Sequence, residues 1–456
     1  MKKSILWLLS DTRKAAEEGT PAIMQRQNNR LAEIVEFART NSRYYYELYK
    51  DLPDQIEDIR LLPVTSKKKL MPSFNDWVTD KNVTLEDVRN FVNNPDMIGE
   101  LFLGKYTVAT TSGTTGHRGI FLVDDHALSV NLVLTLRALG NWLGIGDFIK
   151  YLIHGGRMAV VAAEGHFLVS SGINRFRKKS MMLGSAMKLF SVHTPIPELV
   201  AQLNHFQPSI VIGYGSVISI LASEQAEGRL RIKPILVEPA GESLPKKEYE
   251  RISKLFNTKV RDLYGATECP FLSVDCKCGW YHVNSDWVIV EPVDTNYKPV
   301  QPGEQSHTVL LTNLANRVQP ILRYDLGDSI MVRPDPCPCG NPHPAIRVEG
   351  RSADILIFLT EDGEEVAIPP LVIATLVDRT AGIRFFQIVQ TTSTNLRVRL
   401  LTMNNDDSDF VWDQMETEIR NILNQYKLNH ITIERAEEPP EQALGGKYRR
   451  IIPLKR

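Results

Sequence analysis

The sequence predicts an α/β protein with a large layered N-terminal domain, part of it rich in β-structure, and a smaller C-terminal α+β domain. Three observations predict this fold class. The chain has 456 residues, which is enough for several structural units. Between about residues 101 and 280, short apolar runs alternate with helix-like segments, as in a largely parallel sheet. Beyond residue 351, strand-like and helix-like runs form a separate, smaller unit.

The predicted N-terminal domain covers residues 1–351, and the C-terminal domain covers 352–456. Residues 1–100 are expected to be mostly helical, because apolar residues recur at helical spacing over 28–49 without glycine or proline. Residues 101–280 form the α/β core, and turn residues separate the β-like runs of 281–351. Core strands are predicted over Val108–Thr111, Val160–Ala163, Ser209–Ile212, Pro234–Val237 and Lys259–Leu263, and core helices over Ala127–Leu143 and Lys246–Phe256. In the C-terminal domain, strands are predicted over Ile355–Leu359 and Phe385–Thr391, and helices over Pro370–Asp378 and Asp409–Gln425.

Composition and charge exclude several classes of protein. Lys and Arg number 53 and Asp and Glu number 54, so the near-neutral chain lacks the charge excess typical of proteins that capture nucleic acid or an anionic membrane. An apolar content of 43% excludes a disordered chain. The apolar run Ile5–Leu9 is shorter than the roughly 7–15 residues of a signal peptide core. We therefore expect a cytoplasmic protein without nucleic-acid or membrane partners.

The segment Thr110–Gly119, with the sequence TTSGTTGHRG, follows a strand-like run. Its small residues allow the backbone to turn tightly and present successive N–H groups to an anion, while its hydroxyl groups add donors. It lacks the G-K-[ST] ending of a Walker loop. The segment is interpreted as a phosphate-binding loop; a Ser/Thr/Gly-rich surface loop is the alternative.

The segment Asp262–Glu268, DLYGATE, also ends a predicted strand, where ligands bind in α/β sheets. An aromatic ring there can stack on a base, and the following carboxylate can hold Mg²⁺ near phosphates. The alternative is a strand-to-helix turn with a solvated Glu268. Two later segments, RYDLGD over 323–328 and EGRSAD over 349–354, offer an Asp for ribose hydroxyls and a nearby Arg, or else form salt-bridged turns.

A last segment, GGKYR over 445–449, places a Lys between small residues and a basic run, which suits either a mobile loop or a basic tail.

The five segments described above, in this order along the chain, resemble the motifs of the adenylate-forming superfamily of acyl-CoA synthetases, nonribosomal adenylation domains and luciferases. The short helical N-terminal region, the chain length and the phosphate loop without a terminal Lys most resemble the phenylacetate–coenzyme A ligase branch.

The resemblance implies ATP-dependent activation of a carboxylic acid, aromatic if the branch holds, to an acyl-adenylate with release of pyrophosphate. The acyl group would then pass to the thiol of coenzyme A or of a carrier protein's phosphopantetheine. An amine, a hydroxyl or a cofactor is an alternative acceptor. A non-catalytic nucleotide-binding homologue is a further alternative, which the retention of Glu268, Asp328 and Lys447 disfavours.

The resemblance also assigns residues. The ATP-binding set is Thr111, Ser112, Gly113, Thr114, Thr115 and Gly116 at the phosphates, Gly241, Glu242, Tyr264 and Gly265 at adenine, and Asp328 and Arg351 at the ribose. Thr267 would contact the α-phosphate, Glu268 would hold Mg²⁺, and Lys447 would bridge carboxylate and phosphate. Gly119 stands where many relatives have the loop Lys, and Arg118 is a candidate replacement. The C-terminal domain is implied to be a mobile lid hinged at about Ser352–Asp354.

Four residues at predicted strand ends, namely His166, Phe167, Tyr214 and Gly215, are candidates for the acyl pocket. An imidazole can meet a carboxylate and aromatic rings can wall an aryl group, although a lone His is more often a structural residue. A homodimer is a further expectation for this chain. The sequence itself does not name the acid.

All five cysteines lie between Cys269 and Cys339, and four of them form two C-x-C-G units. Such units are typical of a tetrahedral Zn²⁺ site, which would be structural because four protein ligands leave no open position. The ligands are expected to be four of Cys276, Cys278, His282, Cys337 and Cys339. The resemblance favours the set with His282, but the choice between Cys278 and His282 stays open, and four reduced core thiols are the alternative.

Overall fold

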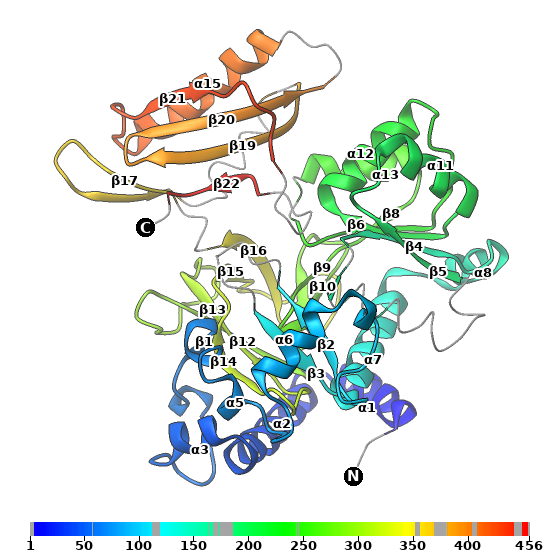
Figure 1. The fold of residues 1–456 in the computed structure, drawn as a ribbon, viewed down its shortest axis with the longest axis vertical. Helices are drawn as coiled ribbons and strands as arrows, with labels where there is room; N and C mark the ends of the chain where they lie inside the picture. The colour runs from blue at the N-terminus through cyan, green and yellow to red at the C-terminus, as the bar shows by residue number, and fades with distance from the viewer. Residues whose placement is uncertain are drawn as a thin grey trace.

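The computed structural model shows two bodies, a large one built from the N-terminal part of the chain and a smaller one built from the C-terminal part (Figure 1). The predicted fold class is therefore confirmed. The structure describes residues 4–56, 58–111, 119–163, 165–166, 172, 186–242, 244, 246–351, 356–368, 380, 382–403, 408–441 and 449–454.

The chain begins with helices, as the sequence predicts. They are α1 (Ile5–Glu18), α2 (Thr20–Asn41), α3 (Arg43–Tyr49), α4 (Lys67–Leu70), α5 (Phe74–Trp77) and α6 (Leu85–Asn93). The helix expected over 28–49 is interrupted at Ser42, which has an extended backbone and caps α3 by accepting a hydrogen bond from the N–H of Tyr45. Apolar spacing does not reveal this break, because both helices keep an apolar face in the same core.

A five-stranded parallel sheet forms the centre of the α/β core, with the strand order β5-β4-β6-β7-β8. Its strands are β4 (Met158–Ala162), β5 (Met187–Ser191), β6 (Ile210–Tyr214), β7 (Leu236–Ala240) and β8 (Lys259–Val260). The helices of this region are α7 (Asp125–Trp142), α8 (Ile145–Ile153), α11 (Ile196–Phe206), α12 (Gly215–Ala226) and α13 (Lys246–Phe256). Val211 and Val237 pack with α11, α12 and α13, whereas the alternate residues Ile210 and Leu236 pack with Trp142 of α7. Both faces of the sheet are covered, which explains its continuous apolar strands.

Two further sheets make up the β-rich part. One has the order β1-β14-β13-β12 and the other β15-β16-β11-β10-β9. Their strands are β1 (Thr65–Ser66), β9 (Leu263–Ala266), β10 (Cys269–Asp275), β11 (Tyr281–Val283), β12 (Val288–Val293), β13 (Thr308–Asn313), β14 (Ile321–Asp325), β15 (Asp328–Val332) and β16 (Ala345–Arg351). A separate hairpin pairs β2 (Thr107–Thr110) with β3 (Ile120–Val123). The single strand expected over 259–263 is thus divided: β8 ends the parallel sheet and β9 begins the antiparallel one, so the chain changes sheets just before Tyr264.

The C-terminal body has a hydrophobic core of its own, whose buried members all lie beyond residue 355. It contains β17 (Leu356–Leu359), β18 (Glu365–Ile368), β19 (Ile383–Thr392), β20 (Asn395–Thr402), α15 (Ser408–Gln425), β21 (Thr432–Arg435) and β22 (Ile451–Ile452). The helix expected over 370–378 and the hinge expected at 352–354 lie outside the described residues. The boundary at 351/352 stays a prediction.

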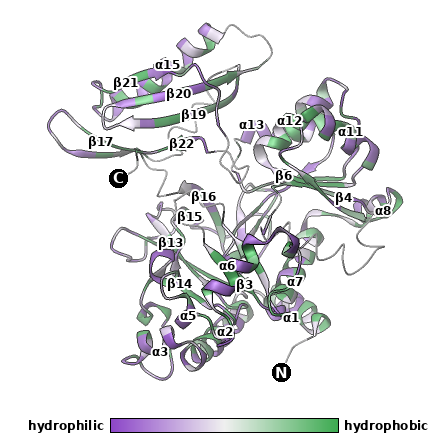
Figure 2. Cartoon of the chain, in the orientation of Figure 1, coloured by the Kyte–Doolittle hydropathy of each residue, from purple (hydrophilic) through white to green (hydrophobic). Residues whose placement is uncertain are grey.

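Helix α8 carries several exposed apolar side chains, including Ile145 and Ile153, and Figure 2 shows its hydrophobic colouring. Among the residues that the structure describes, no single helix is long and apolar enough to cross a membrane. Only α7 and α8 taken together, bent by 108° at their junction, pass on length and composition.

Candidate active site and candidate metal centre

The Tyr264 hydroxyl donates a hydrogen bond of 2.7 Å to Oδ2 of Asp328. Tyr264 lies in β9 and Asp328 begins β15, and these strands are the two edges of the five-stranded antiparallel sheet. Edges of a flat five-stranded sheet would stand about 19 Å apart at the usual strand spacing. The sheet therefore curls, and the curl brings together two residues that the resemblance assigns to adenine and ribose. Arg351 is the register partner of Asp328 on β16, so the backbones of the two ribose candidates are neighbours.

The segment after Tyr264 is a hairpin between β9 and β10 rather than the strand-to-helix turn that was the alternative. A Cβ on Gly265 would lie 2.0 Å from the carbonyl oxygen of Pro270, so only glycine allows this close approach of the two strands. Ala266 pairs with Cys269, which leaves Thr267 and Glu268 at the tip of the hairpin. The tip faces a small recess that both residues line with Asn313 and Asn316.

Glu268 is held at this tip by two partners. Its Oε1 accepts a hydrogen bond of 2.9 Å from the Tyr324 hydroxyl, and its carbonyl oxygen accepts one of 3.0 Å from Nδ2 of Asn313. Desolvation raises the pKa of the Glu268 carboxyl above its usual value, while the Tyr324 hydrogen bond and the charge of Lys67 oppose the rise. A carboxylate fixed in position offers the oxygen donors that Mg²⁺ takes in proteins, so Glu268 can serve as such a ligand.

The candidate phosphate loop connects β2 and β3. Its described ends are joined by two hydrogen bonds: the N–H of Thr111 donates to the Gly119 carbonyl at 3.0 Å, and the N–H of Gly119 donates to Oγ1 of Thr111 at 2.9 Å. The loop is therefore closed at its base like a hairpin. The candidate residues Ser112, Gly113, Thr114, Thr115 and Gly116 lie outside the described residues.

Two predicted groups, one for the acyl pocket and one for adenine, lie side by side at the carboxyl ends of β6 and β7. Tyr214 pairs with Ala240, and Gly215 and Gly241 follow them. Glu242 accepts a hydrogen bond of 2.7 Å from the N–H of Ser216, so its carboxylate caps the N-terminus of α12. Burial raises the pKa of the Tyr214 hydroxyl. Ligands bind in α/β folds at this end of the strands.

His166 is buried beside the end of β2. Its carbonyl accepts a hydrogen bond of 2.8 Å from the N–H of Thr110, its ring lies 5.3 Å from that of Phe91, and its Nε2 lies 3.5 Å from the Asn94 carbonyl. These contacts fit the structural alternative for this histidine. The remaining candidates, Phe167 and Lys447, lie outside the described residues.

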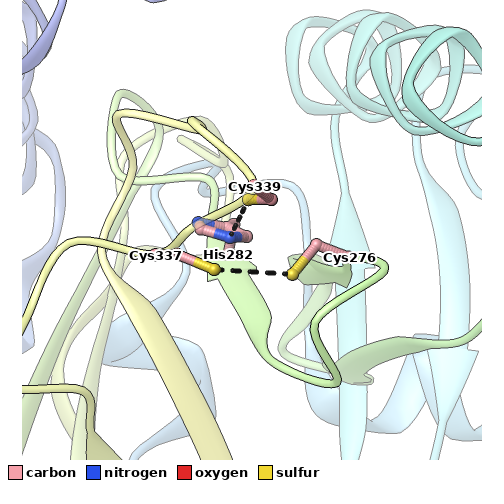
Figure 3. A group of neighbouring side chains, drawn as sticks. All are labelled: Cys276, His282, Cys337 and Cys339. Carbon is pink, nitrogen blue, oxygen red and sulfur yellow. Dashed lines mark hydrogen bonds between the residues drawn. The ribbon is translucent and has the colours of Figure 1, made fainter.

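The candidate metal centre brings together Cys276, His282, Cys337 and Cys339, whose ligand atoms all lie within 4.8 Å of one another (Figure 3). Cys276 follows β10, His282 lies in β11, and the other two belong to the connection between β15 and β16. The two Sγ atoms of Cys276 and Cys337 are 3.8 Å apart, and Sγ of Cys339 is 3.1 Å from Nε2 of His282. Cys278 is not a member of the group.

Both C-x-C-G units form the same turn. The N–H of Gly279 donates to the Cys276 carbonyl, and the N–H of Gly340 donates to the Cys337 carbonyl, each at 3.0 Å. The two glycines have φ of 73° and 83°, which disfavours any residue with a side chain. The turn that orients the cysteines of each unit therefore needs glycine at its last position.

The imidazole of His282 is oriented by a backbone partner, because its Nδ1 lies 2.8 Å from the carbonyl oxygen of His343. A proton on Nδ1 leaves the Nε2 lone pair directed at the thiols, which is the arrangement of a metal-binding histidine. Three thiols and one imidazole, two of the four residues buried and two half-buried, converge on one point and fit the donor set of structural Zn²⁺.

Sequence reasoning missed two residues near Glu268 in the candidate active site, namely Tyr324 and Lys67. Tyr324 lies inside the RYDLGD motif, so its neighbourhood carried a signal, although Asp328 received the role. Lys67 carried none, since it is one of three consecutive lysines.

Known proteins and solved structures that resemble this chain identify its fold. No family model matches the chain. Protein CapK of Staphylococcus aureus is 24% identical over 414 residues, which cover 87% of this chain and 82% of that protein. A solved 2-hydroxyisobutyryl-CoA ligase, in the postadenylation state with 2-HIB-AMP, matches 95% of this chain and 89% of its own with a TM-score of 0.65 at 19% identity. A benzoate CoA ligase from Burkholderia xenovorans LB400 matches 75% of this chain and 67% of its own with a TM-score of 0.52 at 16% identity. The chain thus has the fold of the adenylate-forming acyl-CoA and aryl-CoA ligases.

Proposed function

We propose that this chain is an AMP-forming acid–thiol ligase. It would activate a carboxylic acid with ATP to an acyl-adenylate and then pass the acyl group to a thiol, either that of coenzyme A or that of a carrier protein. The observation that carries the proposal is the convergence of two motifs, DLYGATE and RYDLGD, through two hydrogen bonds. One joins Tyr264 to Asp328 across the curled sheet, and the other joins Tyr324 to Glu268. The fold shared with CoA ligases supports it.

In the first step, a carboxylate oxygen of the acid attacks the α-phosphorus of ATP and pyrophosphate leaves. Two anions must approach each other, so the barrier falls when positive groups stabilise the developing charge. Glu268 would hold Mg²⁺, which supplies such charge at the phosphates. Asp328 and Tyr264 would orient the ribose and adenine, and Lys447 would bridge the acid and the α-phosphate. In the second step a thiolate attacks the acyl carbon, and AMP leaves.

An aromatic acid is the proposed substrate, supported by the branch resemblance and by Tyr214 at the carboxyl end of β6. The proposed structural Zn²⁺ would be bound by Cys276, His282, Cys337 and Cys339. It would hold the connection between β15 and β16 against the β10–β11 hairpin, and hence support the curl that joins Tyr264 to Asp328.

The test is pyrophosphate release from MgATP across a panel of aryl and aliphatic acids, first with hydroxylamine as a trap and no thiol. We expect release with a subset of acids. A second panel of acceptors, comprising coenzyme A, a phosphopantetheinylated carrier protein and amines, then separates a thiol ligase from an amide-forming enzyme. Binding of ATP without release for any acid would instead favour a non-catalytic nucleotide-binding protein.

A further inference from the structure

The end of the candidate phosphate loop holds a glycine where the resemblance places a lysine, and the structure shows what fills the space. A Cβ on Gly119 would lie 2.8 Å from Cε2 of Phe121 and 3.3 Å from Cδ of Lys67. A longer side chain at position 119 would therefore collide with the Phe121 ring and crowd the aliphatic stem of Lys67. Lysine at position 67 and glycine at position 119 are complementary in space.

The N-terminal helical region delivers Lys67 to this point through a short parallel pairing. Strand β1 adds to the edge of the sheet beside β14, with Thr65 opposite Tyr324 and Ser66 opposite Asp325. The Thr65 hydroxyl secures the register by donating to the Leu322 carbonyl at 2.8 Å. Lys67 comes directly after this strand, as the first residue of α4.

Lys67 also lies near the segment that holds the candidate Mg²⁺ ligand. It is two positions from Thr65, whose register partner Tyr324 donates a hydrogen bond from its hydroxyl to the carboxylate of Glu268. The next two lysines differ in their surroundings: Lys68 and Lys69 are exposed, and Nζ of Lys69 donates to the Val64 carbonyl. Of the three consecutive lysines, only Lys67 is partly buried, with its stem against Gly119.

We propose that Lys67 supplies, from beside Gly119, the positive charge that a lysine at position 119 would carry, and that its ammonium group binds the β- and γ-phosphates of ATP. This inference rests on the proposed function, since it concerns the nucleotide of that reaction. A lysine ammonium is a compact charge on a flexible stem, suited to phosphate oxygens. Its attraction to them is stronger in a partly buried site than in bulk water. The charge is thus supplied by a segment remote in sequence from the loop.

The test compares the binding of MgATP and of AMP to the full chain by calorimetry. Lys67→Met removes the charge and keeps an apolar stem against Gly119 and Phe121. We expect it to weaken MgATP binding by about 10- to 100-fold, as for loss of a hydrogen bond to a charged group, and to change AMP binding by less than about 3-fold. Lys68→Met, on the same helix, is the matched control and should leave both affinities unchanged. Lys67→Gln is a second removal of the charge, in case the methionine variant folds poorly.

The outcomes separate this inference from the proposed function. A wild-type chain that binds neither nucleotide overturns both. A wild-type chain that binds MgATP, while both Lys67 variants retain wild-type affinity or lose ATP and AMP equally, overturns the role of Lys67 alone. The role of Lys67 is also overturned if Arg118→Met weakens MgATP binding selectively and the Lys67 variants do not.

Discussion

Tyr264 and Asp328 lie at opposite edges of one five-stranded sheet, yet the hydroxyl of the first donates a hydrogen bond of 2.7 Å to the carboxylate of the second. The pair closes the curl of the sheet and fixes the distance between the candidate adenine and ribose positions. Each residue lies where its own strand meets a turn, so neither strand alone defines the site.

The position of Asp328 in this pair predicts that nucleotide binding depends on the ribose hydroxyl groups. If Asp328 accepts hydrogen bonds from the ribose hydroxyls, the wild-type chain should bind AMP more tightly than 2′,3′-dideoxy-AMP. We expect a difference of about 10-fold or more, the usual value for a hydrogen bond to a charged group. Asp328→Ala should abolish this discrimination in a competitive binding assay. The exposed Asp335→Ala is the control, and equal discrimination in all three chains would contradict the assignment.

The hydrogen bond from Tyr324 to Glu268 predicts a shift in pH dependence. The donor stabilises the ionised carboxylate, so Tyr324→Phe should raise the pKa of Glu268 beyond the rise that desolvation already causes. Metal binding needs the ionised form, which is lost as the pH falls through this pKa. The acid limb of pyrophosphate release against pH should therefore move to higher pH.

The matched control for this shift is Tyr297→Phe, because the Tyr297 hydroxyl makes a similar bond of 2.9 Å to a different carboxylate, that of Asp325. This variant should leave the acid limb of the pH profile of pyrophosphate release unchanged. An unmoved limb in Tyr324→Phe would show that Glu268 does not govern this titration.

The geometry of the candidate metal centre predicts which cysteines are needed for zinc binding and stability. Protein purified without chelator should contain one zinc per chain by elemental analysis. Cys276→Ser and Cys339→Ser should each lose the zinc and unfold at a lower temperature, because metal binding contributes directly to folding free energy. Cys278→Ser should keep the zinc, because Cys278 is not a member of the ligand group, and should lower the unfolding temperature by less than either ligand variant. Zinc loss in Cys278→Ser, with retention in Cys276→Ser, would exchange their roles.

A buried carboxyl in the parallel sheet predicts a stability effect. Burial, with the nearby charges of Asp262 and Asp275, raises the pKa of Glu238 to about 8. The folded state thus favours the neutral form, and this contribution to stability is lost as the pH rises from the unfolded pKa of about 4.3 towards 8. Glu238→Gln removes the ionisation. Its free energy of unfolding relative to wild type should therefore increase with pH across this window, by up to about 1.4 kcal/mol per pH unit.

Urea unfolding at several pH values measures this slope. Glu250→Gln, at an exposed position of α13, is the control and should show no such trend. A flat difference for Glu238→Gln would mean that the carboxyl titrates normally in the folded chain.

The role proposed for Lys447 predicts a separation of the two half-reactions. Lys447→Ala should slow adenylation by on the order of 10²–10³, the usual effect of removing one preorganised charge-stabilising group. It should leave thiolation of a supplied acyl-adenylate largely intact, because the lid would withdraw this lysine for the second step. Equal losses in both steps, measured by single-turnover kinetics, would contradict the role.

Local patterns were enough to predict the parallel core, the β-rich part and the five residues that include the four of the Cys/His group, although they left the choice between Cys278 and His282 open. The apolar runs of the central strands are continuous because both faces of their sheet are covered, and each C-x-C-G unit forms its own turn. Two features were missed, for different reasons. Lys67 gains its position from the pairing of Thr65 with Tyr324, and no short window of sequence contains both of these residues. The DLYGATE segment forms a hairpin in which the backbones of Gly265 and Pro270 approach closely, and their residue types alone do not reveal this local contact.

The two cysteine turns stand 61 positions apart, and the stretch between them contains β11 to β15 with Asp328 near its end. A zinc ion bound to both turns would close this stretch into a ring in the folded chain. Removing the metal would open the ring and let the two turns separate, with a gain in chain entropy that grows only slowly with ring length. The metal would then set how firmly the strands that carry Asp328 are held, at a distance from the nucleotide itself.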